Sequence, residues 1–193
     1  MSTDAPPTDA DRETRFRQLY ATTYSDVLRF ALRRAQAGHA EDVTAEVFLV
    51  AWRRFPDVPV APGEAKAWLL GVARLTLHNN SRGRQRYAAL AVRIAEDLPR
   101  QLESDPDLDA LTRRLDLAAA WPRLSPSDQE AIALIAWDGL TTAQAATVIG
   151  VSAVAFRLRL SRARRALRRH LSESPRPVPG RSAHEHQIAR RTR

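Results

Sequence analysis

The chain has 193 residues, no cysteine and a formal net charge of +8 at pH 7. Its length suits one medium domain or two small ones, and the lack of cysteine excludes a disulfide framework, a thiol nucleophile and a thiolate-bound zinc site. The first 15 residues are polar and charged, and no run of about 18 apolar residues occurs. We therefore expect a cytoplasmic protein without a signal sequence or a membrane-spanning helix.

The positive charge is concentrated near the C-terminal end of the chain. Residues 157–193 contain 12 arginines and only two acidic residues. A strongly basic segment of this kind favours a polyanionic partner such as nucleic acid. Hydrophobic residues make up 44% of the chain, which is enough to form globular cores.

The segment Arg12–Arg86 is predicted to form a helical domain, because its apolar residues recur at helical spacing and strand patterns are nearly absent. Gly38 is expected to end the first helical run. The prolines and the glycine within Arg54–Glu64 predict a loop. A further helix is expected from Ala65 to about Ser81. The predicted core face of this helix consists of Trp68, Val72 and Leu75.

The rest of the chain is expected to form a linker, a second helical domain and a tail. Residues 87–116 are rich in aspartate and glutamate and contain two prolines, which predicts an acidic flexible linker. The second domain is expected over residues 117–171. Residues 1–11 and 172–193 are polar, and we expect both segments to be disordered.

The second domain ends in the pattern of a helix-turn-helix. Helices are predicted at 117–124 and 128–137, and a third, short helix contains two small alanines that allow close crossing by its neighbour. Gly150 then suits a left-handed turn, and Ser152 is placed to cap a fourth helix. This spacing is typical of helix-turn-helix domains, whose second helix enters the DNA major groove.

The last helix is predicted to have one apolar face and one basic face when successive residues are turned by about 100°. The apolar face consists of Phe156, Leu160, Ala163, Leu167 and Leu171. The opposite face consists of Arg157, Leu158, Ser161, Arg162, Arg164, Arg165, Arg168 and Arg169. On this face Leu158 is suited to contact a thymine methyl group. A solvated, arginine-rich helix end is the alternative interpretation.

Together these motifs resemble the bacterial RNA polymerase sigma factors of the extracytoplasmic-function (ECF) group. The matching residues are Ala40–Arg54, Ala67–Arg74, Asn79, Asn80, Arg82–Arg86 and the helix-turn-helix. The resemblance covers roughly residues 12–86 and 112–171. It implies an all-α fold of two small helical domains joined by an acidic flexible linker, with the helix-turn-helix in the second domain. It also implies a sigma factor that binds core RNA polymerase and directs promoter-specific transcription initiation.

The resemblance implies that the helix over Glu41–Arg54 binds the clamp helices of the polymerase beta-prime subunit. The residues expected at this contact are Glu41, Asp42, Glu46, Phe48, Leu49 and Trp52. Phe48 and Trp52 lie on a different side of the predicted helix from Val43 and Val47, which suits one core and one partner. The alternative is that the domain buries both aromatic side chains in its own core.

By the same resemblance, the third helix and the loop before it recognise and open the promoter minus-ten element. The expected DNA-binding residues are Lys66, Arg74, His78, Asn80, Arg82, Arg84 and Arg86. The loop Phe55–Glu64 is expected to hold a base flipped out of the stack. Two alternatives stay open: Asn79 is a buried core amide, and Arg82–Arg86 is a solvated helix end.

The helix-turn-helix is implied to read the minus-thirty-five element. The expected contacts are Arg157, Leu158, Ser161, Arg162, Arg164 and Arg165. Many family members open this helix with Pro-x-Gly-Thr-Val and have a serine after the first arginine. This chain has Ser152–Phe156 and Leu158 there instead, so the promoter sequence stays open. The resemblance implies that the linker passes near the active-site and RNA-exit channels of the polymerase. The alternative interpretation is that the linker is only a flexible tether between the two domains.

No catalytic, metal-binding or cofactor-binding pattern is recognisable in the sequence. The seven glycines occur singly, so no phosphate-binding loop is predicted, and the only metal-like cluster, His184–His186, falls in the predicted tail. We therefore expect no enzymatic activity, no metal and no cofactor. The expected partners are core RNA polymerase, promoter DNA and an anti-sigma factor, without membrane insertion.

Two other functions compete with the sigma-factor interpretation. The first is a polymerase-independent helix-turn-helix regulator whose N-terminal domain dimerises or senses a ligand; it predicts a stable homodimer on a palindromic duplex. The second is a protein that binds polymerase and antagonises it.

Overall fold

A computed structural model describes residues 9–79 and 115–173, and every structural statement below concerns these two ranges. Within them the regular elements are α-helices and short 3-10 helices, and neither range contains a strand. This confirms the predicted all-α fold. The predicted acidic linker 87–116 lies almost entirely outside the described residues, and so does most of the predicted tail.

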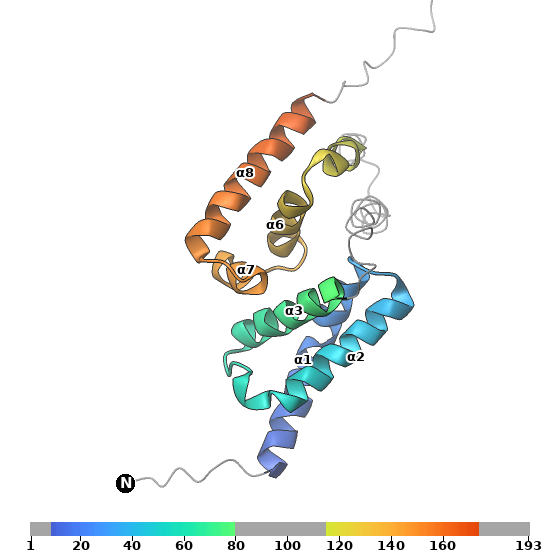
Figure 1. Ribbon diagram of the computed structural model, residues 1–193, viewed down its shortest axis with the longest axis vertical. Coiled ribbons are helices and arrows are strands. Elements are labelled where there is room, and N and C mark those ends of the chain that lie inside the picture. Colours follow the sequence, from blue (N-terminus) through green and yellow to red (C-terminus); the bar gives the residue numbers. More distant parts are fainter. Residues whose placement is uncertain (1–8, 80–114, 174–193) are drawn as a thin grey trace, which may run out of the picture.

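The N-terminal domain is a helical bundle (Figure 1). They are α1 (Asp9–Leu32), α2 (Ala37–Arg53) and α3 (Pro62–Asn79), with the 3-10 helix η1 (Phe55–Asp57) between α2 and α3. The core forms where apolar residues recur every three or four positions along each helix. Val27, Phe30, Val43, Val47 and Leu69 are each no more than 1% exposed.

The boundary between α1 and α2 differs from the prediction. Gly38 lies in the first turn of α2 and does not end the first helix, which stops at Leu32. The chain turns here because the Arg34 N–H bonds to the Ala31 carbonyl at 2.9 Å, and Gln36 then takes an extended conformation as the cap of α2. Helix α3 begins at Pro62, ahead of the predicted Ala65, because proline is favoured in the first turn of a helix.

The predicted core face of α3 is wrong. Leu75 is 59% exposed, while Trp68 and Val72 are only partly buried. The buried residues of this helix are Ala65, Ala67, Leu69, Leu70, Ala73 and Thr76. Helix α3 packs against α1 and α2 and also against α7 of the second domain. Its small residues are therefore covered from two directions, which a search for one apolar stripe does not anticipate.

The C-terminal domain contains the predicted helix-turn-helix. Residues 115–120 are helical, and the elements that follow are η2 (Trp121–Arg123), α6 (Pro126–Ala136), α7 (Thr142–Ile149) and α8 (Ala153–Ser172). Ser125 caps α6, as its position before Pro126 predicts. Trp121, Leu134 and Phe156 are no more than 1% exposed and belong to the core.

In the described ranges no single helix has both the length and the apolar character needed to cross a membrane. Helices α7 and α8 satisfy that criterion only as a pair, and they are bent by 100° with respect to each other.

Candidate nucleic-acid and polymerase interfaces

Local side-chain chemistry fixes the turn between α7 and α8. Thr141 and Gln144 form a capping box: the Gln144 N–H donates to Thr141 Oγ1 at 3.3 Å, and the Thr141 N–H donates to Gln144 Oε1 at 2.8 Å. Gly150 ends α7 in the left-handed conformation, with φ of +78°. Ser152 then accepts the Ala155 N–H at 3.1 Å and starts α8. The predicted roles of Gly150 and Ser152 are confirmed.

Helix α8 presents the predicted basic face to solvent. Phe156, Leu160 and Ala163 are buried on the opposite side, and α8 contains no acidic residue. All six predicted minus-thirty-five residues are exposed, namely Arg157, Leu158, Ser161, Arg162, Arg164 and Arg165. This leaves a mainly cationic surface one helix wide, which matches the width of the major groove.

Two apolar side chains interrupt this basic face near the start of α8. Leu158 is 61% exposed and Val154 is 57% exposed. Because they are four residues apart, they lie on the same side of the helix. Sequence reasoning singled out Leu158 and missed Val154, although the same helical spacing links the two.

The predicted minus-ten residues are brought together only in part. Lys66 and Arg74 are partly buried, and each forms an ion pair. Lys66 Nζ lies 2.9 Å from Asp26 Oδ2, and Arg74 Nε lies 2.7 Å from Glu130 Oε1. His78 is exposed, and its Nδ1 lies 2.8 Å from the Arg74 carbonyl oxygen. Asn80, Arg82, Arg84 and Arg86 lie outside the described residues.

Asn79 is exposed at the end of α3 and is not a buried core amide. It lies one residue beyond His78, on the turn where α3 ends. Its side chain is therefore available to solvent in this structure.

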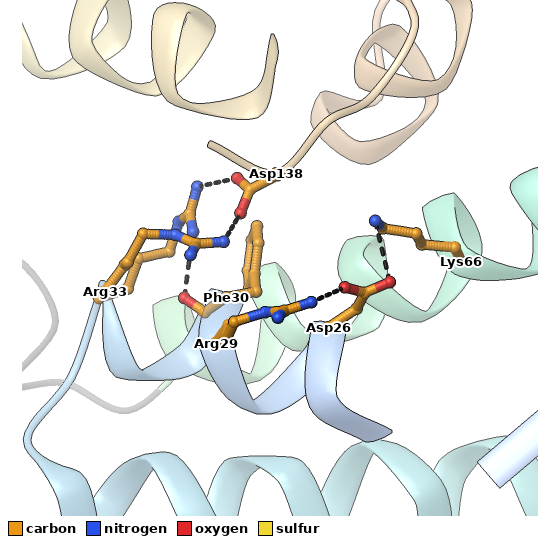
Figure 2. Close-up of polar contacts among 7 residues, drawn as sticks. Asp26, Arg29, Phe30, Arg33, Lys66 and Asp138 are labelled. Atoms are coloured by element: carbon orange, nitrogen blue, oxygen red, sulfur yellow. Dashed lines mark hydrogen bonds and ion pairs between the residues drawn. The ribbon is translucent and has the colours of Figure 1, made fainter. Parts of the chain in front are cut away.

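Asp26 holds Lys66 at the edge of the bundle (Figure 2). Partial burial by itself raises the pKa of the Asp26 carboxyl. Hydrogen bonds from Lys66 and Arg29, together with the positive charges of both, outweigh that effect, so the pKa lies below its usual value. Asp26 therefore stays ionised at neutral pH and fixes the ammonium group of Lys66.

The loop between α2 and α3 lines a cavity of about 480 Å³ on the N-terminal domain. Helix α1 forms the other wall, and Phe55 and Val58 of the loop are largely buried in the domain. Arg15 and Lys66 supply positive charge to the cavity, while Val60 is 81% exposed. The loop that was expected to hold a flipped base thus borders a hollow with apolar walls, two cations and the Asp26 carboxylate that pairs with Lys66.

The predicted polymerase-binding residues occupy one exposed side of α2, with one exception. Glu41, Asp42 and Glu46 are exposed, Leu49 is 55% exposed and Trp52 is 38% exposed. Phe48 is only 4% exposed. It packs against α1, where its ring centroid lies 4.6 Å from that of Tyr20 and 6.2 Å from that of Tyr24. The predicted alternative of a core position thus describes Phe48 and not Trp52.

The exposed aromatic ring of Trp52 is held in place by α1. The Arg12 guanidinium lies 4.5 Å from the Trp52 ring centroid and donates to the Trp52 carbonyl oxygen at 2.6 Å. The Phe16 ring packs edge-on against the Trp52 ring at 5.0 Å. Sequence reasoning missed Arg12, because 40 residues separate it from Trp52. Neither described range contains a cluster of residues suited to hold a metal ion.

Comparison with known proteins gives two family matches in chain order. Residues 19–87 match the model of Sigma-70 region 2, and residues 114–167 match that of Sigma-70 region 4. ECF RNA polymerase sigma factor SigL of Mycobacterium tuberculosis is 32% identical over 158 residues, which cover 81% of this chain and 89% of SigL. ECF RNA polymerase sigma factor BldN of Streptomyces coelicolor is 32% identical over 166 residues, covering 83% of this chain and 62% of BldN.

Two solved structures share the fold. Sigma factor RpoE in complex with the anti-sigma factor NepR from Bartonella quintana superimposes with a TM-score of 0.56 at 23% identity, covering 83% of this chain and 99% of RpoE. CnrH in complex with the cytosolic domain of CnrY gives a TM-score of 0.52 at 23% identity, covering 86% of this chain and all of CnrH.

Proposed function

The chain belongs to the ECF RNA polymerase sigma factors, and from this premise we propose how its two domains divide the work of promoter-specific transcription initiation. The N-terminal domain binds core RNA polymerase and opens the minus-ten element, and the helix-turn-helix domain binds the minus-thirty-five element as duplex. The observation that carries this assignment is the basic face of α8, a helix without acidic residues that forms the second helix of a helix-turn-helix with capped helices. The helical bundle that precedes it in the chain has an exposed tryptophan, Trp52.

The polymerase contact is proposed at the exposed side of α2. Leu49 and Trp52 supply apolar contact area, and the exposed Glu41, Asp42 and Glu46 supply negative charge around it. An aromatic anchor surrounded by charged residues is typical of protein interfaces. Phe48 supports this surface from within the domain, through its contacts with Tyr20 and Tyr24. The partner is proposed to be the clamp helices of the beta-prime subunit.

The minus-ten contact is proposed at the cavity bordered by α1 and the loop before α3. Its size and apolar walls suit an unstacked base, and Arg15 and Lys66 suit the phosphates on either side of that base. His78 continues this surface along α3. Asn80, Arg82, Arg84 and Arg86 are proposed to extend it by further phosphate contacts.

The minus-thirty-five contact is proposed along α8. The first turns of the recognition helix reach base edges, and later turns pass the phosphate backbone. Arg157, Leu158, Ser161 and Arg162 therefore face the bases, while Arg164 and Arg165 contact phosphates or neighbouring bases.

Replacing Arg162 with alanine is expected to impair promoter use without changing the affinity for core polymerase. Loss of a bidentate contact to guanine costs about 1 to 3 kcal/mol, which is roughly a 5- to 150-fold loss of duplex affinity. Run-off transcription and a polymerase pull-down measure the two properties separately. Arg169→Ala in the last turn of α8 is the matched control and is expected mainly to change the salt dependence. An equal loss of promoter use and polymerase binding would contradict the assignment.

Leu158 is expected to read a thymine methyl group. Replacing that thymine with deoxyuridine should weaken duplex binding about fourfold, because one buried methyl-sized group contributes about 0.8 kcal/mol. Leu158→Ala should bind the two duplexes equally well. The control is Leu115→Ala, which removes an equally exposed leucine outside α8. If Leu158→Ala kept the full difference between the duplexes, this contact would be disproved.

Other properties follow from the same proposal. The protein acts in the cytoplasm, has no catalytic activity of its own and needs no cofactor. RpoE and CnrH have each been solved with a protein partner, NepR or CnrY, and an anti-sigma factor is proposed as a partner here as well. The alternative of a polymerase-independent regulator is not favoured, because matches to both sigma regions occur in order along the chain.

The proposed function is tested by reconstitution. Purified chain is mixed with core RNA polymerase and fragmented genomic DNA, and the bound fragments are sequenced to identify promoters. Run-off transcription from these fragments should start at one position and only when the chain is present. If no fragment supported initiation at a defined start, the sigma-factor function would be rejected.

A further inference from the structure

Two exposed apolar side chains, Val154 and Leu158, form an apolar pair on the basic face of α8. Val154 is 57% exposed and Leu158 is 61% exposed, whereas Phe156 between them is fully buried in the core. Because Val154 and Leu158 are four residues apart, they lie one above the other on the same side of the helix. The apolar pair is therefore open to a partner.

The apolar pair belongs to the first two turns of the recognition helix. Ser152 caps α8, and its hydroxyl accepts the Ala155 N–H at 3.1 Å, so Val154 lies in the first turn. In helix-turn-helix proteins the N-terminal residues of the recognition helix contact base edges. The apolar pair thus lies on the part of α8 that meets bases in the proposed function.

The charges around the apolar pair favour duplex DNA as its partner. Arg157 and Arg162 are exposed beside Leu158, and α8 contains no acidic residue. An apolar protein surface placed over the pair would bury guanidinium groups without a partner, which is unfavourable. The major groove instead offers these arginines base acceptors and phosphates. Charge complementarity therefore selects DNA over an apolar protein surface.

The chemistry of base edges then decides which bases lie beneath the apolar pair. In the major groove the C5-methyl group of thymine is the apolar group that a base edge displays, whereas guanine displays two acceptors and cytosine an amino donor. A polar group covered by an apolar side chain loses its water without gaining a hydrogen bond, which is unfavourable. Val154 and Leu158 therefore favour thymine and disfavour guanine or cytosine beneath them.

The spacing of the apolar pair sets the distance between the two bases. Four residues of an α-helix rise about 6 Å along the helix axis. Successive base pairs are about 3.4 Å apart. The two side chains therefore reach base pairs that are one or two steps apart.

Resting on the proposed function, we infer that Val154 and Leu158 together read two thymine methyl groups, one or two base pairs apart, in the minus-thirty-five element. Val154 is thus a specificity-determining residue in addition to Leu158, and the apolar pair restricts both positions to T·A. Both residues fall where this chain departs from the Pro-x-Gly-Thr-Val opening and the following serine of many family members. We therefore expect the two T·A pairs to be a feature of this chain's own promoters.

Removal of single methyl groups from the DNA tests this inference. Duplexes are selected from a random pool by the full chain in the presence of core polymerase, and the enriched sequences should share the two T·A pairs. Each thymine is then replaced with deoxyuridine, which lacks only the methyl group. Each replacement should weaken binding about fourfold, and both together about 15-fold if the contacts are independent. Deoxyuridine at a thymine outside the element is the control and should have no effect.

Cytosine and 5-methylcytosine separate a methyl contact from recognition of DNA shape. Replacing either T·A pair with C·G should weaken binding more than deoxyuridine does, because the amino group of cytosine loses its water. The base 5-methylcytosine restores the methyl group and should recover about fourfold in affinity relative to cytosine. If A·T-rich shape alone were recognised, cytosine and 5-methylcytosine would bind equally weakly, and the inference would be overturned.

Protein variants assign each methyl group to its side chain. Val154→Ala should lose the response to deoxyuridine at one of the two thymines and keep it at the other, and Leu158→Ala should show the opposite pattern. The melting temperature should stay nearly unchanged, because Val154 is exposed. Leu115→Ala is the control and should keep both responses. If Val154→Ala kept both responses, or lost polymerase binding as strongly as duplex binding, the inference would be incorrect.

The outcomes separate this inference from the proposed function. If the chain enriched duplexes with two methyl-dependent T·A pairs but run-off transcription did not start, the sigma-factor function would fail and the inference would hold. If transcription started at a defined position but the promoters lacked the two T·A pairs or ignored their methyl groups, only the inference would fail. If no duplex were enriched, both would fail.

Discussion

Replacing Trp52 with alanine is expected to weaken binding to core RNA polymerase by about thirtyfold. Truncation of an aromatic anchor at the centre of an interface commonly costs about 2 kcal/mol or more, which corresponds to that factor. Trp52 is suited to this role because its ring is 38% exposed yet held by Phe16 and Arg12. A held ring loses little conformational entropy on binding. Affinity is measured by titrating labelled chain with core polymerase.

The stability of the isolated protein decides how the Trp52→Ala result is interpreted. We expect a small loss of melting temperature, because much of the ring already faces solvent. Leu75→Ala is the control: it removes an exposed apolar side chain of α3 in the same domain and should leave polymerase affinity unchanged. A large drop in melting temperature together with unchanged polymerase affinity would show that Trp52 acts within the fold and not at the interface.

Replacing Phe156 with alanine is expected to cost about 3 to 5 kcal/mol of unfolding free energy, as is usual when a buried phenylalanine is truncated. The Phe156 side chain is fully buried and starts the apolar face of α8. Its loss leaves a cavity beneath the recognition helix. Minus-thirty-five duplex binding should be lost at temperatures where the unmodified protein still binds.

Urea unfolding measures this effect. Leu158→Ala, two residues further along α8, is the control for stability, because its side chain is 61% exposed and its removal should leave the unfolding midpoint nearly unchanged. If Phe156→Ala unfolded at the same urea concentration as the unmodified protein, the assignment of the buried face of α8 would be incorrect.

The elements that the sequence predicts well are those set by local chemistry. Gly150 takes the left-handed conformation that ends α7, and Ser152 caps α8. The two faces of α8 also follow from sequence alone, because one side is apolar and the other has only arginines, serine and two exposed apolar residues. The exposure of all six predicted α8 residues follows from the same helical periodicity.

What sequence reasoning missed depends on contacts between distant residues. The acidic partners of Lys66 and Arg74 lie 40 and 56 residues away in the chain, at Asp26 and Glu130. The core face of α3 was misassigned because its small residues pack on α7, which belongs to the other domain. Phe48 and Trp52 are both aromatic and lie four residues apart, so helical periodicity places them on the same side of α2. The position of α1 decides which of the two rings is buried.

Site-specific cross-linking in the open promoter complex tests the division of labour most directly. Single cysteines are introduced at His78 on α3 and at Ser161 on α8, and each is labelled with a photoreactive group; the unmodified chain has no cysteine and is the blank. We predict that the probe at position 78 reacts with the single-stranded minus-ten element and the probe at position 161 with the minus-thirty-five duplex. Reaction of both probes with the same element, or with neither, would contradict the account.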